Sequence, residues 1–445
     1  MSFGDIRVVH RAEWLMARIA TIGSVVLRKL GGERAGEMAI HRFLSSPHVS
    51  VERIVESLGA RTAEQSAGRH ILVAQDTTEL TFAGRDKKRR GFGVAANGEL
   101  GFFIHPVIAV DVESEAVIGL VDAKIWTRPM GKPTRRRSRV AADKESARWL
   151  AGCQCAASVL QTAAKLTMVA DRESDIYSLF ARRPANLDLI VRAAQDRNLA
   201  EGGKLFAALS GASLLATAKV KVASRGPGDK GRLATVELRA GKVLIARPHN
   251  GLVEDLPTDI TLTLVEAREV NAPPEVKEPL LWRLLTSHDV GDAAQADAVV
   301  QLYRLRWRIE QLFRALKSDG LALEDSQLIT PERLFNLAAM ALGGAIRTIQ
   351  LVDARDGSSR PSTDLIDDRF LPALKRLSQK LEGKTERQKN PHPPTSLAFL
   401  AWIAARLGGW NCYYKPPGPK TMRSGWTQLT ATLAGYDLAM DIQNS

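Results

Sequence analysis

The chain has 445 residues, of which 45% are apolar and 25% charged, as in an ordinary globular protein of two or three domains. Its 62 Lys and Arg against 49 Asp and Glu leave a net charge of +13. That surplus favours a polyanionic partner, with nucleic acid ahead of an anionic membrane surface. No run approaches the roughly 18 uncharged apolar residues of a membrane span, and the N-terminus lacks the pattern of a secretion signal. We therefore expect a cytoplasmic protein that does not enter a membrane.

The first 70 residues are expected to be helical, with segments over 11–30 and 51–58. From residue 71 the sequence pattern changes to short apolar runs, which are typical of strands. A helix over 143–165 separates the third run from the fourth. Five strands are predicted in this region: 71–76, 101–110, 116–121, 166–171 and 187–193. Three strands, a helix, a strand, a helix and a strand indicate a mixed α/β sheet.

The stretch from about 195 to 295 reads as an all-β insertion joined by turns of Gly, Pro and charged residues. We predict strands over 216–222, 233–238, 243–246 and 260–266, with a hairpin turn at Arg239–Lys242. A helix follows from about 292 to 318, and residues 331–445 are mostly helical. The three cysteines, Cys153, Cys155 and Cys412, lack the partners of a zinc site and cannot all pair, so they are expected to be reduced and buried.

One helical segment carries an unusual set of polar side chains. At about 100° per residue, Tyr303, Arg306, Glu310 and Lys317 fall within a stripe roughly 60° wide. A separate apolar stripe lies beside it and is expected to face a core: Leu305, Ile309, Leu312, Phe313 and Leu316. A carboxylate between cations and a phenol suits a helix that holds a metal ion beside a phosphate backbone. Trp307 is interpreted as a packing residue.

Two aspartates stand at the ends of buried-looking strands. Asp76 and Asp171 are each the first charged residue after an apolar run, and in an open α/β sheet the carboxyl ends of strands are where ligands bind. Taken singly, either residue suits a turn or a helix cap, and Asp171 precedes a predicted helix. Together with Glu310 they form an oxygen-only set, which hard divalent ions prefer. Two Mg²⁺ ions held by three carboxylates would support in-line phosphodiester displacement.

These residues resemble the signatures of the bacterial DDE insertion-sequence transposases. The closest resemblance is to the branch that cuts and pastes through DNA hairpin ends, as the enzyme of the kanamycin-resistance composite transposon does. The matches are collinear and span nearly the whole chain. They comprise Gln75-Asp76-Thr77-Thr78, Ala170-Asp171-Arg172-Glu173-Ser174-Asp175-Ile176, the Tyr303, Arg306, Glu310, Lys317 set, His41-Arg-Phe-Leu, Lys144-Glu-Ser, Trp282-Arg-Leu-Leu-Thr and Ala405-Arg-Leu-Gly-Gly.

The resemblance implies a ribonuclease-H-like mixed-sheet core over 71–330, with the all-β insertion at about 195–295. It also implies a helical DNA-binding region over 1–70 and a helical C-terminal region over 331–445 that forms dimers. Asp76, Asp171 and Glu310 would be catalytic and hold two Mg²⁺ ions, with Mn²⁺ as a substitute. Tyr303, Arg306, Lys317 and Trp282 would contact DNA.

By the same resemblance Trp282, 21 positions before Tyr303, would receive a flipped base near the transposon end. The alternative is that Trp282 is a core residue of a strand. Lys317, two turns beyond Glu310, would contact DNA backbone away from the cut. Two basic runs, 85–90 and 132–139, are interpreted as phosphate-contacting loops, although such runs are more often solvated surface.

The predicted function is therefore that of a transposase. It would act as a homodimer on the inverted repeats of double-stranded DNA ends and on target DNA, in the bacterial cytoplasm and at the nucleoid when DNA-bound. Two alternatives stay open: a metal-dependent nuclease that does not join strands, and a catalytically silent DNA-binding regulator derived from a transposase.

Overall fold

The computed structural model describes residues 3–82, 91–95, 98–128, 147–222, 231–248, 255–317, 320–355, 357–358, 360–413 and 415–444. Both basic runs, 85–90 and 132–139, lie outside the described residues, as does 144–146. The chain divides into two compact units. The first unit comprises Met1–Ser66, Thr77–Gly131 and Arg308–Ser445, and the second comprises Ala67–Asp76 and Lys132–Trp307.

The second unit is built on a mixed sheet whose strands run in the order β1-β6-β7-β11-β10-β9-β8. The pairs β1–β6 and β6–β7 are parallel, and every pair from β7–β11 onward is antiparallel. The strands are β1 (His70–Gln75), β6 (Lys165–Ala170), β7 (Asp188–Arg192), β8 (Ala216–Val222), β9 (Arg232–Ala246), β10 (Asp259–Val270) and β11 (Leu281–Thr286). The α/β class predicted from the apolar runs is confirmed.

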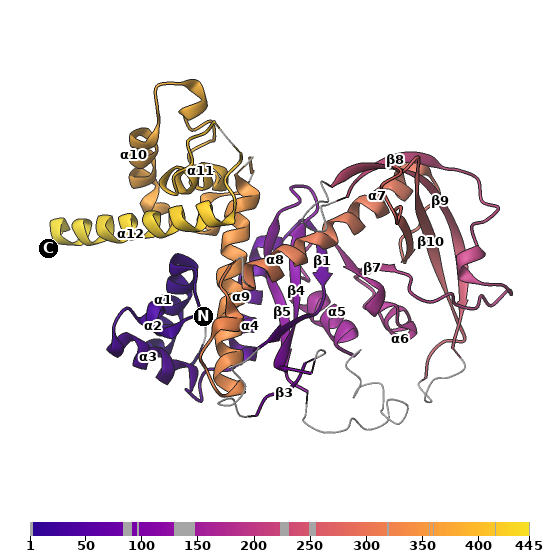
Figure 1. Ribbon diagram of the computed structural model, residues 1–445, viewed down its shortest axis with the longest axis horizontal. Coiled ribbons are helices and arrows are strands. Elements are labelled where there is room, and N and C mark those ends of the chain that lie inside the picture. Colours follow the sequence, from indigo (N-terminus) through magenta and orange to yellow (C-terminus); the bar gives the residue numbers. More distant parts are fainter. Residues whose placement is uncertain are drawn as a thin grey trace. The chain divides into compact units, whose positions relative to one another are not determined.

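Among the residues of this unit that the structure describes, three α-helices accompany the sheet: α5 (Ala147–Val159), α6 (Tyr177–Ala181) and α7 (Ala293–Arg304). The cap residue Asp292 precedes helix α7, and its side chain accepts a hydrogen bond from the backbone amide of Gln295. Helix α7 packs across β8, β9 and β10 (Figure 1). Helix α5 packs on β1, where the buried Gln75 side chain donates to the carbonyl of Trp149. These contacts fix the sheet edge at which β1 ends.

In the described part of the first unit, strand β4 pairs antiparallel with three other strands. The strands are β2 (Thr78–Thr81), β3 (Gly93–Val94), β4 (Leu100–Asp111) and β5 (Val117–Trp126). The helices are α1 (Ile6–Ile22), α2 (Leu27–Gly31), α3 (Arg34–Leu44), α4 (Val51–Ser66), α8 (Arg308–Leu316), α9 (Pro331–Ala354), α10 (Leu371–Leu381), α11 (Leu397–Leu407) and α12 (Pro419–Asn444).

Helix α9 is the centre of the first unit. It packs against α1, α3, α4, α8, α11, α12 and β5, and most of its side chains are buried. Among the described residues it is the helix that is long and apolar enough to cross a membrane, and 78% of its most apolar window is buried inside the protein. Such burial is also expected of the core helix of a folded domain.

The last two long helices approach each other closely. Helices α11 and α12 are in contact, and a Cβ atom built on Gly425 of α12 would lie 1.5 Å from the carbonyl oxygen of Ala404 on α11. No side chain fits at that distance, so glycine is required there. At Gly435, further along α12, a Cβ atom would have no neighbouring heavy atom within 4 Å.

Several predictions from the sequence differ from the structure. The hairpin at Arg239–Lys242 does not form, because β9 runs unbroken through it and Gly241 pairs with Leu264 of β10. Gly241 serves close packing instead: a Cβ there would lie 3.0 Å from the Leu209 side chain. Strand β11 was not among the predicted strands, although a strand around Trp282 was the alternative interpretation of that residue. Two cysteines, Cys155 and Cys412, are only half-buried, although all three cysteines are free.

The predicted single helix over about 292–318 is also wrong. Helix α7 ends at Arg304, Leu305–Trp307 form a 3₁₀ turn, and α8 begins at Arg308. The Leu305 amide bonds the carbonyl of Leu302, three residues back, which tightens the backbone. A constant 100° rotation therefore does not relate Tyr303 to Glu310. The apolar stripe was correct, since its five side chains are buried.

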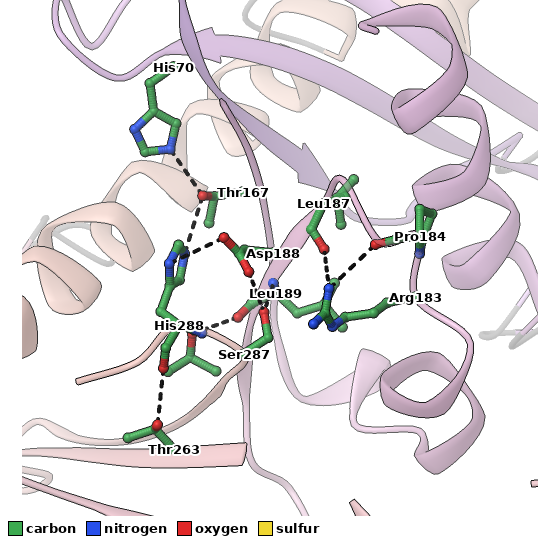
Figure 2. Close-up of polar contacts among 11 residues, drawn as sticks. His70, Thr167, Arg183, Pro184, Leu187, Asp188, Leu189, Thr263, Ser287 and His288 are labelled. Atoms are coloured by element: carbon green, nitrogen blue, oxygen red, sulfur yellow. Dashed lines mark hydrogen bonds and ion pairs between the residues drawn. The ribbon is translucent and has the colours of Figure 1, made fainter. Parts of the chain in front are cut away.

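The edge of the second unit where β1, β6 and β7 begin carries a chain of polar contacts (Figure 2). Thr167 Oγ1 lies 3.0 Å from His70 Nε2 and 3.3 Å from His288 Nε2. His288 Nδ1 lies 3.4 Å from an oxygen of Asp188, and the Ser287 hydroxyl donates to the other oxygen of Asp188 at 2.9 Å. Burial lowers the pKa of His288, the Asp188 charge raises it, and Lys165 and Arg183 lower it further. The histidine is therefore neutral near pH 7.

Candidate active site

Two carboxylates follow adjacent parallel strands at the same edge of the sheet. The register between β1 and β6 pairs Ala74 with Val169, so the residues two positions further on are Asp76 and Asp171. Parallel strands point their carboxyl ends to one edge, and both aspartates therefore lie there. Their side chains are partly exposed, at 20% and 32%. The sequence pattern, an acidic residue directly after an apolar strand, therefore identified two carboxylates that lie at the same edge of the sheet.

A single guanidinium group holds both carboxylates. Arg306 Nη1 donates to Asp76 Oδ2 at 3.2 Å, and Arg306 Nη2 lies 3.5 Å from Asp171 Oδ2. The Arg306 residue is only 6% exposed. Arg306 lies in the 3₁₀ turn that follows α7, and from there its side chain extends to the edge of the sheet. One positive charge therefore partly compensates two negative charges in a half-buried setting.

Asp171 has further partners at its second oxygen, Oδ1. That atom accepts a hydrogen bond from the Arg172 amide at 2.8 Å, as a helix-capping aspartate does. Tyr303 donates its phenolic hydrogen to the same atom at 3.3 Å, and Arg192 Nη1 lies 3.8 Å away. Burial, and then the charge of Asp171, raise the pKa of Tyr303. The phenol therefore stays protonated and acts as a donor.

Trp282 of β11 packs against Tyr303 and lines a cavity. The two rings meet edge to face, with centroids 5.0 Å apart, and Trp282 is 9% exposed. The cavity has a volume of about 300 Å³, at the lower end of the range for small-ligand pockets. Its lining residues are Arg172, Arg192, Ala193, Ala194, Phe206, Glu278, Pro279, Leu280, Leu281, Trp282 and Arg283. Aromatic and guanidinium side chains thus share one concave surface.

Several of these lining residues were missed from the sequence. Arg192 ends β7, the third parallel strand of the sheet, so the rule that located Asp76 and Asp171 would also have located it. Arg283 lies over the ring of Phe206, 4.4 Å from its centroid, and also binds Glu266 at 3.0 Å. Nothing in the spacing of Phe206 and Arg283 indicates that they meet.

Glu310 and Lys317 belong to the first unit. Glu310 lies in the first turn of α8 and is half-buried. Lys317 follows the last residue of α8, and its amide donates to the Phe313 carbonyl at 3.1 Å. Among the described residues, no group of three or more His, Cys, Asp or Glu side chains is arranged to hold a metal ion. The site as described consists of Asp76, Asp171 and their partners, and the three-carboxylate cluster stays a prediction.

A comparison with known protein families matches most of the central part of the chain. The family model described as "Transposase DDE domain" matches residues 67–344. The matched span begins just before β1 and ends within α9. It includes Asp76, Asp171 and Glu310, the residues that the sequence predicted as the acidic set.

Proposed function

Because the chain belongs to the family of transposases with a DDE domain, we propose that it is a DNA transposase of the hairpin-forming cut-and-paste branch. It cleaves transposon ends through DNA hairpins and transfers the 3′-hydroxyl ends into target DNA. The observation that carries the proposal is the pair of carboxylates, Asp76 and Asp171, gathered at one sheet edge by the guanidinium group of Arg306. The resemblance extends the proposal to a ribonuclease-H-like core in which the strands of about 195–295 are an insertion.

Asp76, Asp171 and Glu310 would hold two divalent cations, Mg²⁺ with Mn²⁺ as a substitute. The donor set fits, because carboxylate oxygens are the ligands such ions prefer. The pair Asp76 and Asp171 already accommodates a cationic group. Metal ions held by these carboxylates would supply the activation of an attacking water or hydroxyl group and the stabilisation of the leaving oxygen of a phosphodiester.

The chain's own cations and donors have separate roles in this proposal. Arg306 compensates the carboxylates in the absence of metal, and its low exposure keeps it beside them. Tyr303 stays protonated and orients Asp171 through its hydrogen bond. Arg192 lies near the same carboxylate and lines the adjoining cavity, where it would contact phosphate. Lys317 would contact DNA backbone through its charge.

Trp282 would receive a flipped base in the cavity that it lines. A base taken out of the duplex loses its stacking partners, and an aromatic wall replaces them. The volume of about 300 Å³ and the arginines beside Trp282 support this role. The packing of Trp282 on Tyr303 also agrees with the alternative, in which it is a core residue of β11.

Each region of the chain has its own part in the proposed function. Residues 1–70 would bind the transposon ends, 71–330 would carry out the chemistry, and 331–445 would form the dimer that brings two ends together. Double-stranded DNA and a second copy of the chain are therefore the proposed partners. The proposed location is the bacterial cytoplasm.

The test is a two-step DNA assay on the full chain with Mg²⁺. Uncleaved ends report nicking and hairpin formation, and pre-cleaved ends report joining to a target plasmid. Both steps are expected, and each should be lost with Asp76→Asn. Cleavage without joining of pre-cleaved ends would instead identify a nuclease, and stable end binding without cleavage would identify a silent regulator.

A further inference from the structure

A small cavity in the first unit is lined by two arginines that the proposed reaction does not use. Its volume is about 40 Å³, and its walls come from α4, β5 and α9, which pack together. Helix α4 contributes Arg61 and helix α9 contributes Arg347. Apolar side chains also line it: Leu58, Ile118, Leu120 and Ile346. An apolar wall strengthens any charge interaction inside the cavity.

The other polar side chains of the cavity wall already have partners. The Thr62 hydroxyl donates to the carbonyl of Leu120 at 2.6 Å. The Gln350 amide donates to the carbonyl of Ile118 at 2.5 Å, and Gln65 accepts from a neighbouring guanidinium group at 3.3 Å. These bonds leave the two arginines as the principal source of unused hydrogen-bond donors facing the cavity.

Neither Arg61 nor Arg347 makes a hydrogen bond or ion pair with another residue in the described parts of the chain. Both are half-buried. Burial, followed by the charge of Arg61, lowers the pKa of Arg347 to about 10, and the charge of Glu13 raises it. The two guanidinium groups are thus within electrostatic reach of each other. A guanidinium group without water or an acceptor is costly to bury.

The acidic groups around Arg61 do not remove this excess of donors. Burial lowers the pKa of Arg61, while Asp364 and then Glu64 raise it. Asp364, however, already binds Arg360 Nε at 2.7 Å, and Glu64 is exposed on the outer side of α4. The charge of Arg360 lowers the pKa of Arg61 in turn. The cavity therefore presents positive charge and donors without a matching acceptor.

We propose that Arg61 and Arg347 form a binding site for one tetrahedral oxyanion, chemically a phosphate group. Guanidinium groups match the oxygens of phosphate in geometry and charge, and a shared anion would offset the repulsion between the two arginines. A water needs roughly 10–15 Å³ of such space. A cavity of about 40 Å³ therefore holds one phosphate group, and any sugar or base attached to that group would lie outside the cavity. The phosphate comes either from a DNA backbone or from free inorganic phosphate.

The first experiment titrates inorganic phosphate into the full-length protein at constant ionic strength and follows the melting temperature and the heat of binding. For free phosphate we expect a saturable rise in melting temperature and one bound anion per chain. Both signals should disappear in Arg347→Gln. Arg61→Gln, on the other helix, makes the same test independently if one variant folds poorly. The matched control is Arg333→Gln, an exposed arginine of the same helix α9.

The second experiment distinguishes the two sources by measuring DNA binding against salt concentration. If a backbone phosphate occupies the site, Arg347→Gln lowers the slope of log affinity against log salt by about 0.9, and free phosphate causes no saturable shift. If free phosphate occupies it, the slope is unchanged and the phosphate titration saturates. Equal phosphate responses in wild type, Arg347→Gln and Arg333→Gln, with an unchanged slope, would overturn the proposal. This outcome does not depend on cleavage, so it is separate from the fate of the proposed function.

Discussion

Arg306 Nη1 lies 3.2 Å from Oδ2 of Asp76, although the two residues are 230 positions apart in the sequence. The position of this buried guanidinium group, beside two carboxylates at the ends of strands, favours a cation. Arg306→Gln removes the guanidinium charge that Asp76 and Asp171 share and should destabilise the metal-free protein by about 1–3 kcal/mol. Added Mg²⁺ should then raise the melting temperature of Arg306→Gln more than that of the wild type. Equal Mg²⁺ effects on both proteins would show that the carboxylate pair does not take the ion.

The acidic residues are expected to be required for chemistry and dispensable for DNA binding. Asp76→Asn, Asp171→Asn and Glu310→Gln keep the size of each side chain and remove its charge. Cleavage in Mg²⁺ should fall to background for each variant, while a gel-shift assay should show end binding close to wild type. Full cleavage by any one of the three would contradict its assignment as a metal ligand.

Trp282→Ala should impair hairpin formation more than first-strand nicking. Loss of a base–aromatic stack costs about 1–3 kcal/mol, or roughly a 5- to 150-fold effect. The two steps are separated by denaturing gel electrophoresis of end-labelled substrates. Trp282→Phe keeps an aromatic face against Tyr303 and should recover most of the hairpin yield. Parallel loss of both steps in Trp282→Ala would favour the role of a core residue.

The polar chain around His288 should make the protein sensitive to acid. The folded-state pKa of His288 lies below its ordinary value of 6.5, so the folded protein disfavours the proton that the unfolded chain binds. The stability is therefore present above pH 6.5 and is lost as the pH falls below that value. His288→Gln should flatten the dependence of melting temperature on pH, and His10→Gln, at an exposed position, should leave it unchanged. A matching flattening in both variants would assign the effect to other groups.

Packing between α11 and α12 should depend on Gly425. Gly425→Ala forces a methyl group against the Ala404 carbonyl and should cost about 1–3 kcal/mol in the free energy of unfolding. Gly435→Ala on the same helix meets nothing and should stabilise it by about 0.5–1 kcal/mol. Chemical denaturation of the two variants measures both effects. A destabilising Gly435→Ala would indicate that the open face of α12 is occupied in solution.

Part of the site is predictable from the sequence, because an acidic residue directly after an apolar run marks the end of a strand. Apolar runs that end in an acid located β1 and β6, and the parallel pairing then placed Asp76 and Asp171 together. The helical repeat was less reliable, because it assumes one rotation per residue. The 3₁₀ turn at Leu305–Trp307 breaks that assumption, and it accompanies a tertiary contact of Arg306 that no local pattern specifies.

The glycine in the predicted hairpin did not indicate a turn. The Arg239–Lys242 segment has the composition of a turn, yet Gly241 lies within a long strand and makes room for Leu209. The cavity beside Trp282 was equally hidden, because arginines on strands resemble solvated surface until the sheet brings Arg192 and Arg283 to one side. Both failures arise from contacts between residues far apart in the chain.

The burial of α9 has a consequence for biosynthesis. This helix is covered by α1 and α4 from the beginning of the chain and by α11 and α12 from its end. A ribosome therefore releases this long apolar segment before α11 and α12, which cover part of it, have been translated. Until then the nascent polypeptide exposes a surface suited to chaperones, and loss of the last two helices would leave that surface permanently open.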